Sequence, residues 1–153
     1  MHWSVLAAYF MPFRYKFLIT AGATWRGSPI NDQILDSTGL MAVRTCAGGM
    51  YSGLTPGSRQ WFAIDLARPD DDQLDAEARA WIEDTQQQVF DVLKSSNFYS
   101  TMAQAFQDVT VFGTAPVVMY EDFENVLRCY LPAAGEYYLG VGARLSVDTF
   151  YRE

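Results

Sequence analysis

The chain has 153 residues, of which half are hydrophobic and 15% are aromatic. It contains 18 acidic and 11 basic side chains, which gives a formal net charge of -7. This length and composition fit one folded region, 1–153, and exclude a disordered chain. The acidic balance and the lack of a Lys/Arg cluster argue against a protein that grips duplex DNA, because phosphate contacts need those cations.

No apolar run reaches the ~20 residues that a membrane-spanning helix needs, and the longest candidate is interrupted by Pro12, Arg14 and Lys16. The first residues lack the basic start and the cleavage site of a secretory signal. Cys46 and Cys129 lie far apart in unlike contexts, which predicts reduced thiols rather than a disulfide. We therefore expect a soluble, unprocessed protein from a reducing compartment, with no membrane partner.

The first 66 residues predict two helices, a loop and a short strand. Residues 3–11 predict a helix that ends before Pro12, and the Gly-, Ser- and Pro-rich segment 20–32 predicts a loop. A second helix begins at 36–38, where Asp, Ser and Thr can each cap it, and ends at Gly53 before a Thr-Pro-Gly turn. Residues 60–66 predict a short strand. The apolar positions of the second helix at helical spacing are Val43, Cys46 or Ala47, Met50 and Leu54.

This second predicted helix contains many small residues, among them Gly39, Gly48, Gly49 and Gly53. Glycine inside a helix costs up to ~1 kcal/mol relative to alanine, so the pattern calls for an offsetting gain. We hypothesise that these glycines let a neighbouring backbone approach closely, either in the same subunit or in the next one. The aromatic pair at 61–62 is then expected to anchor the following strand against the helix.

The middle of the chain predicts two consecutive helices. The first starts near residue 71, where Pro69 and the acidic residues after it are start signals, and ends near Ser95. Its 3.6-residue apolar stripe is expected to be buried. The second helix spans 98–112 and stops at Gly113. The first stripe includes Leu74, Ala78, Trp81, Ile82, Thr85, Val89, Val92 and Leu93, and the second helix places Met102, Ala105, Phe106 and Val109 on one face.

The last third of the chain changes to β-rich alternation. Two runs, 115–122 and 125–132, flank an acidic turn and predict a hairpin with two unlike faces. Residues 135–153 continue in strand-like alternation. The predicted fold class is α+β, with helices in the N-terminal two-thirds packed on a small, mainly antiparallel β region.

Polar residues that suggest chemistry each have a simpler structural explanation. His2, the sole histidine, lies next to the N-terminus, which removes histidine-dependent triads and zinc sites from consideration. The consecutive acids Asp70, Asp71 and Asp72 match the helix dipole better than they match a metal, whose ligands must converge from a shaped loop. Glu83 and Asp84 are adjacent on a helix and point in different directions, so we expect them to be solvated.

The remaining candidates also predict structure rather than catalysis. Gly140-Val141-Gly142 lacks the third glycine of a dinucleotide motif, because Leu145 stands at that position. Cys46 and Cys129 have no activating histidine, and Cys46 is expected to be buried on its apolar stripe and inert. The aromatic pairs Trp61-Phe62 and Tyr137-Tyr138 are expected to pack in the core, since no basic groove surrounds them. We therefore predict no catalytic, cofactor-binding or metal-binding residue, and no enzyme.

The order of segments along the chain resembles a known family. It begins with "WSVLAAYFMP", continues with "ILDSTGLMAVRTCAGGMYSGLTPGSRQWF", the long amphipathic helix and "SSNFYSTMAQAFQDVTVFGTAPVVMYED", and closes with "VDTFYRE". This succession resembles the bacteriophage head-to-tail connecting protein, which is the portal protein of short-tailed phages. The most specific pieces are 36–39, 48–56 with the aromatic pair at 61–62, 96–99, 112–114 and 147–149.

The resemblance implies a structural subunit of a ring, usually a dodecamer, at one vertex of the capsid. Its implied partners are identical subunits, a terminase motor, capsid and scaffolding proteins and a tail adaptor. DNA passes through such a ring at packaging and ejection without specific binding. The implied location is the portal vertex of the virion, and the bacterial host cytoplasm during assembly.

Members of that family run to several hundred residues, and the resemblance covers their N-terminal part, which builds much of the outer wing. The stem, the clip and the tunnel loop have no counterpart in these 153 residues. A fragment, a decayed prophage gene and an incomplete gene model all fit this pattern. The alternative function is a small, non-catalytic adaptor module that binds proteins through its aromatic surface, and an enzyme ranks last.

Overall fold

The computed structural model describes residues 2–15, 34–65 and 75–152. In this part of the chain the helices come first: α1 (His2–Phe10), α2 (Pro12–Tyr15), α3 (Thr38–Leu54), α4 (Ala76–Ser95) and α5 (Phe98–Phe112). The strands follow: β1 (Val118–Asp122), β2 (Val126–Tyr130), β3 (Tyr137–Val141) and β4 (Val147–Arg152). The strands form two separate antiparallel pairs, β1 with β2 and β3 with β4, which confirms the predicted α+β class.

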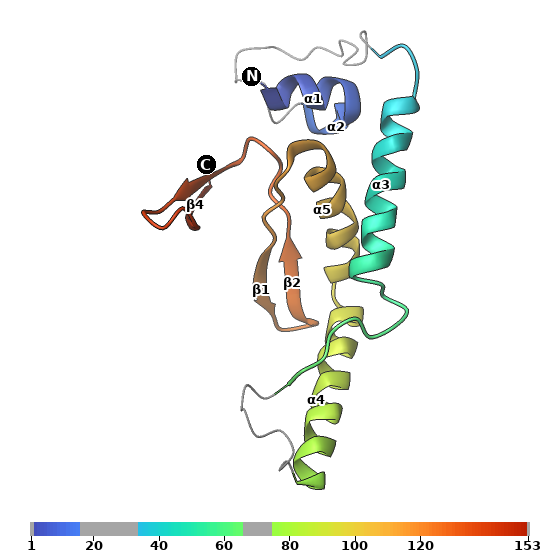
Figure 1. The fold of residues 1–153 in the computed structure, drawn as a ribbon, viewed down its shortest axis with the longest axis vertical. Helices are drawn as coiled ribbons and strands as arrows, with labels where there is room; N and C mark the ends of the chain where they lie inside the picture. Colours follow the sequence, from blue (N-terminus) through green and yellow to red (C-terminus); the bar gives the residue numbers. More distant parts are fainter. Residues whose placement is uncertain (1, 16–33, 66–74, 153) are drawn as a thin grey trace.

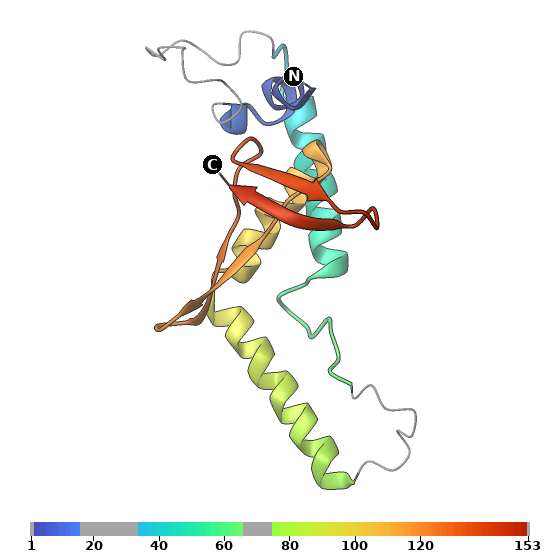
Figure 2. The ribbon, with the colours of Figure 1, turned by 90° about the vertical axis from the view of Figure 1, so that its left-hand side faces the viewer.

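The elements are arranged as an elongated body with two projections (Figures 1 and 2). The helices α3 and α5 lie side by side, and the short helices α1 and α2 cover one end of this pair. Helix α4 extends away from the other end, and the β3–β4 hairpin points to the side. The hairpin of β1 and β2 contacts α5 along the body.

Helix α1 confirms the predicted first helix, and its end shows a feature that the sequence did not predict. Pro12 ends α1 but also begins the one-turn helix α2. Proline is well suited to a first helical position, because that N–H would have no partner there anyway and its φ is already helical. The short α2 turns the chain so that Arg14 reaches α5. The predicted loop at 20–32 lies outside the described residues.

Helix α5 is the centre of the core, and its bounds agree with the prediction. Its C-cap Gly113 adopts the left-handed conformation, with φ of 79°, and donates its N–H to the Val109 carbonyl. The buried face of α5 is rotated from the expected one, since Met102 is half-buried and Val109 is exposed. The buried residues follow i, i+3, i+4 and i+7 spacing: Phe98, Thr101, Ala105, Phe106, Asp108 and Phe112.

The expected burial of α4 is wrong for much of the helix. Trp81 is 67% exposed and Val89 is also exposed, whereas Ala78, Ile82 and Leu93 are half-buried. The reason is the position of the helix, because α4 projects from the body and packs on α5 and β2 only near their junction. Phe90 is its one buried residue within the described range. Leu74 and the acidic run at 70–72 lie outside the described residues.

The predicted strand at 60–66 is also wrong for the residues that the structure describes. Residues 61–65 form no regular secondary structure and pair with no described strand. They lie along α4 instead: the Ile64 N–H donates to Gln86, and Gln60 exchanges hydrogen bonds with Gln86 and Gln87. The Gln86 side chain therefore gives the Ile64 N–H a partner that a neighbouring strand would otherwise supply, and the Gln60 bonds join side chains.

Candidate functional site

The residues once considered for catalysis remain scattered in the structure. His2 is exposed at the start of α1, Glu83 and Asp84 are exposed on α4, and the Gly140–Gly142 segment belongs to β3 and the turn after it. Among the described residues, no group of three His, Cys, Asp or Glu side chains is placed to hold a metal ion. None of the helices in the described ranges is long and apolar enough to span a membrane.

The two cysteines differ in environment, and one of them corrects a prediction. Cys46 is exposed on α3, because its neighbour Ala47 takes the position that faces α5. Cys129 is buried, and burial raises the pKa of its thiol. Asn97 holds the Cys129 backbone from both sides, accepting its N–H at 2.7 Å and donating to its carbonyl at 2.8 Å. Cys129 is therefore a structural residue at the contact between β2 and the start of α5.

The aromatic pairs divide between core and surface. Tyr137 is buried against Trp3 of α1, whereas Tyr138 is 61% exposed, so the expectation of core packing holds only for the first residue of that pair. Trp61 is partly exposed and stacks on Phe98 at 6.2 Å between ring centroids, and Phe62 contacts Phe90. The Trp61-Phe62 pair thus joins the segment after α3 to the junction of α4 and α5.

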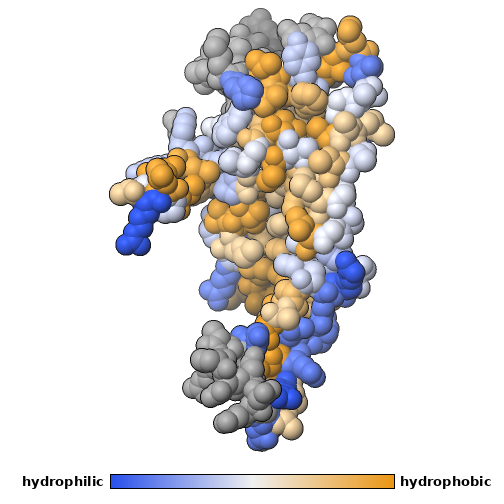
Figure 3. Space-filling view, in the orientation of Figure 1, coloured by the Kyte–Doolittle hydropathy of each residue, from blue (hydrophilic) through white to orange (hydrophobic). Residues whose placement is uncertain are grey.

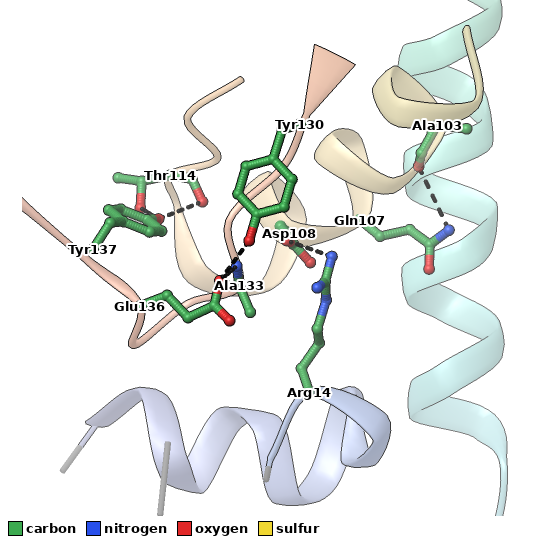
Figure 4. A network of polar contacts seen from close by, with 9 residues as sticks. All are labelled: Arg14, Ala103, Gln107, Asp108, Thr114, Tyr130, Ala133, Glu136 and Tyr137. Atoms are coloured by element: carbon green, nitrogen blue, oxygen red, sulfur yellow. Dashed lines mark hydrogen bonds and ion pairs between the residues drawn. The ribbon is translucent and has the colours of Figure 1, made fainter. Parts of the chain in front are cut away.

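A buried ion pair fixes the N-terminal helices to the core (Figure 4). Arg14 of α2 lies 3.1 Å from Asp108 of α5, and both side chains are largely shielded from solvent. Burial raises the pKa of Asp108 to about 6, although the charge and the hydrogen bond of Arg14 act to lower that pKa. Asp108 was not predicted from the sequence, because the expected face of this helix did not include it and no local pattern indicates a partner that lies 94 positions away at Arg14.

A second polar network holds the start of the β3–β4 hairpin (Figure 4). Tyr137 and Thr114 share a hydrogen bond between their hydroxyls at 2.7 Å. Glu136 accepts bonds from the Ala133 N–H at 2.9 Å and from the Tyr130 hydroxyl at 3.2 Å. Arg152, at the end of β4, donates to the same Tyr130 hydroxyl at 2.9 Å. The base of the hairpin is thereby tied to β2 and to the end of α5.

The glycines of α3 show two different environments. A side chain at Gly39 would lie 3.1 Å from the Phe10 ring, so the predicted close approach is present there, against α1. A Cβ added at Gly48, Gly49 or Gly53 would meet nothing within 4 Å among the residues that the structure describes, so the hypothesis of close packing within the subunit is wrong for them as far as these residues go. They lie on the exposed side of α3, away from the buried residues Val43 and Ala47.

We expect Gly49→Leu to fold with stability equal to or greater than the parent. The reason is that Leu has a better helix propensity than Gly by up to ~1 kcal/mol and meets open space at this position. Gly39→Leu is the matched control and is expected to lower the melting temperature, because its Cβ alone would lie 3.1 Å from the Phe10 ring and the rest of the side chain would have to displace that ring. Thermal unfolding followed by circular dichroism measures both. A clear loss of stability in Gly49→Leu would show that this side of the helix is covered.

Comparison with known proteins identifies the family. The family model described as "Bacteriophage head to tail connecting protein" matches residues 1–153. The chain belongs to this family. It is 35% identical over 153 residues to the portal protein of Salmonella phage epsilon15, and 30% identical over 152 residues to the probable portal protein of Bordetella phage BPP-1. Each match covers 99% of this chain and 27% of the relative, so this connector-family chain spans about a quarter of their length.

Proposed function

We propose that the chain is a structural segment of a phage portal, the connector ring at the junction of head and tail through which the genome is packaged and ejected. The match of the connector family over all 153 residues carries this proposal. The two relatives, both portal proteins by name, support it at 30% and 35% identity. The chain then contributes shape and contact surface rather than chemistry, and residues 1–153 act as one region of the outer wing.

The structure is consistent with a scaffold role in three respects. Its buried polar groups, Arg14 with Asp108 and Asn97 with Cys129, join elements of the fold. Its projecting parts, α4 and the β3–β4 hairpin, keep apolar side chains at the surface. Its net charge of -7 suits a segment that does not grip DNA. The partners proposed are identical subunits, a terminase motor, capsid and scaffolding proteins and a tail adaptor, with location at the portal vertex and, during assembly, in the host cytoplasm.

The gene neighbourhood separates a portal segment from a free-standing adaptor module. A terminase gene on one side and a capsid gene on the other are expected for a portal segment. Sequencing the DNA that flanks the coding region tests this directly. A setting without any head or packaging gene would favour the adaptor function instead.

We expect the 153-residue chain alone to be a monomer or a heterogeneous soluble assembly, and not a uniform ring. A closed ring uses heterologous interfaces, in which one patch meets a different patch on the next subunit. Stable interfaces usually bury upward of ~1,200 Å², and a chain that spans 27% of its relatives supplies only part of both patches. Size-exclusion chromatography with light scattering measures the mass. A single species with the mass of a closed ring would contradict this expectation.

A further inference from the structure

The β3–β4 hairpin meets the body at its base and projects beyond it (Figures 1 and 2). Tyr137, the first residue of β3, is buried, whereas Tyr138 and Val141 further along the strand are each 61% exposed. Figure 3 shows hydrophobic side chains on the hairpin in the face turned to the viewer. An isolated two-stranded hairpin is marginally stable in water, so the contacts at the base decide how firmly this one is held.

The side chain of Tyr137 joins three elements at this base. Its hydroxyl shares a hydrogen bond of 2.7 Å with the hydroxyl of Thr114, just after α5. Its ring centroid lies 6.2 Å from that of Trp3 in α1, and 6.0 Å from that of Phe150 in β4, on which it stacks at 22°. A displacement of Trp3 therefore changes the packing of Tyr137, which is packed in turn on the second strand of the hairpin.

One buried cluster supports both α1 and the approach to the hairpin. Trp3 packs against this cluster, which consists of Ala7, Met11, Phe112 and Ala134. Ala7 and Met11 come from the N-terminal segment, Phe112 ends α5, and Ala134 lies between β2 and β3. The N-terminal segment and the chain that leads into the hairpin therefore cover each other on the end of α5.

The ion pair of α2 holds the other end of the N-terminal segment. Arg14 lies 3.1 Å from Asp108, whose side chain is 3% exposed. Separating one partner of a buried ion pair leaves an uncompensated buried charge, which strongly disfavours lifting α2 alone. The helices α1 and α2 also contact each other. The segment 2–15 is therefore held on the body at both ends, by Trp3 and by Arg14.

We propose that the segment 2–15 is a latch for the hairpin. While this segment is docked on α5, Trp3 fixes Tyr137 and thereby the direction of the β3–β4 hairpin, and when the segment lifts, the hairpin becomes free to change direction. A contact that lifts the segment in an assembly would then release the projecting hairpin without touching it. The proposal concerns the conformation of this chain and goes beyond the proposed function, on which it does not depend.

Hydrogen exchange of the backbone amides, measured by NMR spectroscopy on the isotope-labelled chain, tests this coupling. Trp3→Leu keeps an apolar side chain on the cluster but removes the ring that contacts Tyr137. Its matched control is Val5→Ala on the same helix, because Val5 is 54% exposed. We expect the amides of β3 and β4 to exchange about ten-fold faster in Trp3→Leu than in Val5→Ala, as for the loss of one aromatic pair. The amides of β1 and β2 are the internal reference and are expected to change less.

The reverse measurement uses a change in β4. Phe150→Ala removes the ring that stacks on Tyr137, and the control Tyr151→Ala removes a neighbouring ring that is 64% exposed. A coupling free energy acts equally in both directions, so Phe150→Ala is expected to speed exchange in the second half of α1. The same is expected of the Met11 N–H, which donates to the Ala7 carbonyl at 3.0 Å. Tyr151→Ala is expected to leave these amides close to the parent rate.

Hairpin amides that exchange in Trp3→Leu as they do in Val5→Ala would overturn the latch. An equal acceleration in β1–β2 and β3–β4 would overturn it as well, because it would reflect a loss of overall stability. Should Trp3→Leu not fold, the comparison of Phe150→Ala with Tyr151→Ala decides alone, since both side chains are exposed on β4. Equal exchange of the α1 amides in these two variants would then refute the coupling.

Discussion

Replacing Phe112 with alanine is expected to lower the free energy of unfolding by about 3–5 kcal/mol, the usual range for Phe→Ala in a core. Phe112 is buried at the end of α5, in a cluster with Ala7, Met11 and Ala134. Its ring also meets the Trp3 ring edge-on at 6.0 Å between centroids. The truncation leaves a cavity where the nine-residue helix α1 docks against the end of α5.

Urea unfolding followed by far-ultraviolet circular dichroism measures this effect. The matched control is Val109→Ala on the same helix, which removes an exposed side chain and is expected to change the free energy of unfolding by about 0.5 kcal/mol or less. A Phe112→Ala variant as stable as this control would show that α1 does not depend on the cluster at the end of α5.

The second large effect concerns the pH dependence of stability through Asp108. Its pKa of about 6 in the folded protein lies above the ordinary value of 3.8, so the folded protein binds this proton more tightly than the unfolded chain does. The stability that Asp108 contributes is therefore fully present below about pH 4 and is lost as the pH rises through about 6. The difference amounts to about 3 kcal/mol, at 1.36 kcal/mol per pKa unit.

The variant Asp108→Asn isolates this contribution, because it keeps the shape of the side chain but does not titrate. The free energy of unfolding of the parent, minus that of the variant, is expected to fall by about 2.5 kcal/mol between about pH 4 and about pH 7.5. Urea titrations at a series of pH values provide the measurement. A difference that is constant over this range would mean that burial does not raise the pKa of Asp108.

The variant Arg14→Met tests the partner in the same pair. Without the guanidinium, burial still raises the pKa of Asp108 while both effects of Arg14 that lower it are lost, so this pKa rises further and the ionised form becomes more costly to bury. We therefore expect the variant to be less stable than the parent at about pH 7.5, where the parent keeps Asp108 ionised beside Arg14. At about pH 5 Asp108 is mostly protonated in both proteins, so the difference should nearly vanish.

Elements with local signals were predictable from the sequence. Helix α5 begins after Asn97 and ends at a glycine whose left-handed conformation few other residues adopt easily, so both ends are encoded nearby. The β1–β2 hairpin was likewise marked by alternation on both sides of an acidic turn. The class of the fold follows from these elements alone.

Features that depend on distant contacts were not predictable. The apolar stripe of α4 is present in the sequence, but much of it is exposed because the helix projects from the body. Cys46 and Ala47 are adjacent, and only the packing of α3 on α5 decides which of them is buried. The pairing of Arg14 with Asp108 depends on the short helix α2, which has no strong signal of its own. No residue pattern predicted the function, which came from the resemblance of whole segments in order.

A segment exchange tests the central claim, that this chain is a structural part of a portal. The portal protein of Salmonella phage epsilon15 matches all but 1% of this chain at 35% identity, so its matching segment can be replaced by these 153 residues. The purified chimera would be imaged by negative-stain electron microscopy beside the unmodified portal, with a chimera that carries Phe112→Ala as the control for correct folding of the inserted segment. The account predicts closed rings of the same diameter as the unmodified portal, and their loss in the Phe112→Ala chimera. A chimera whose inserted segment is folded by thermal unfolding, but which forms no closed ring, would contradict the account.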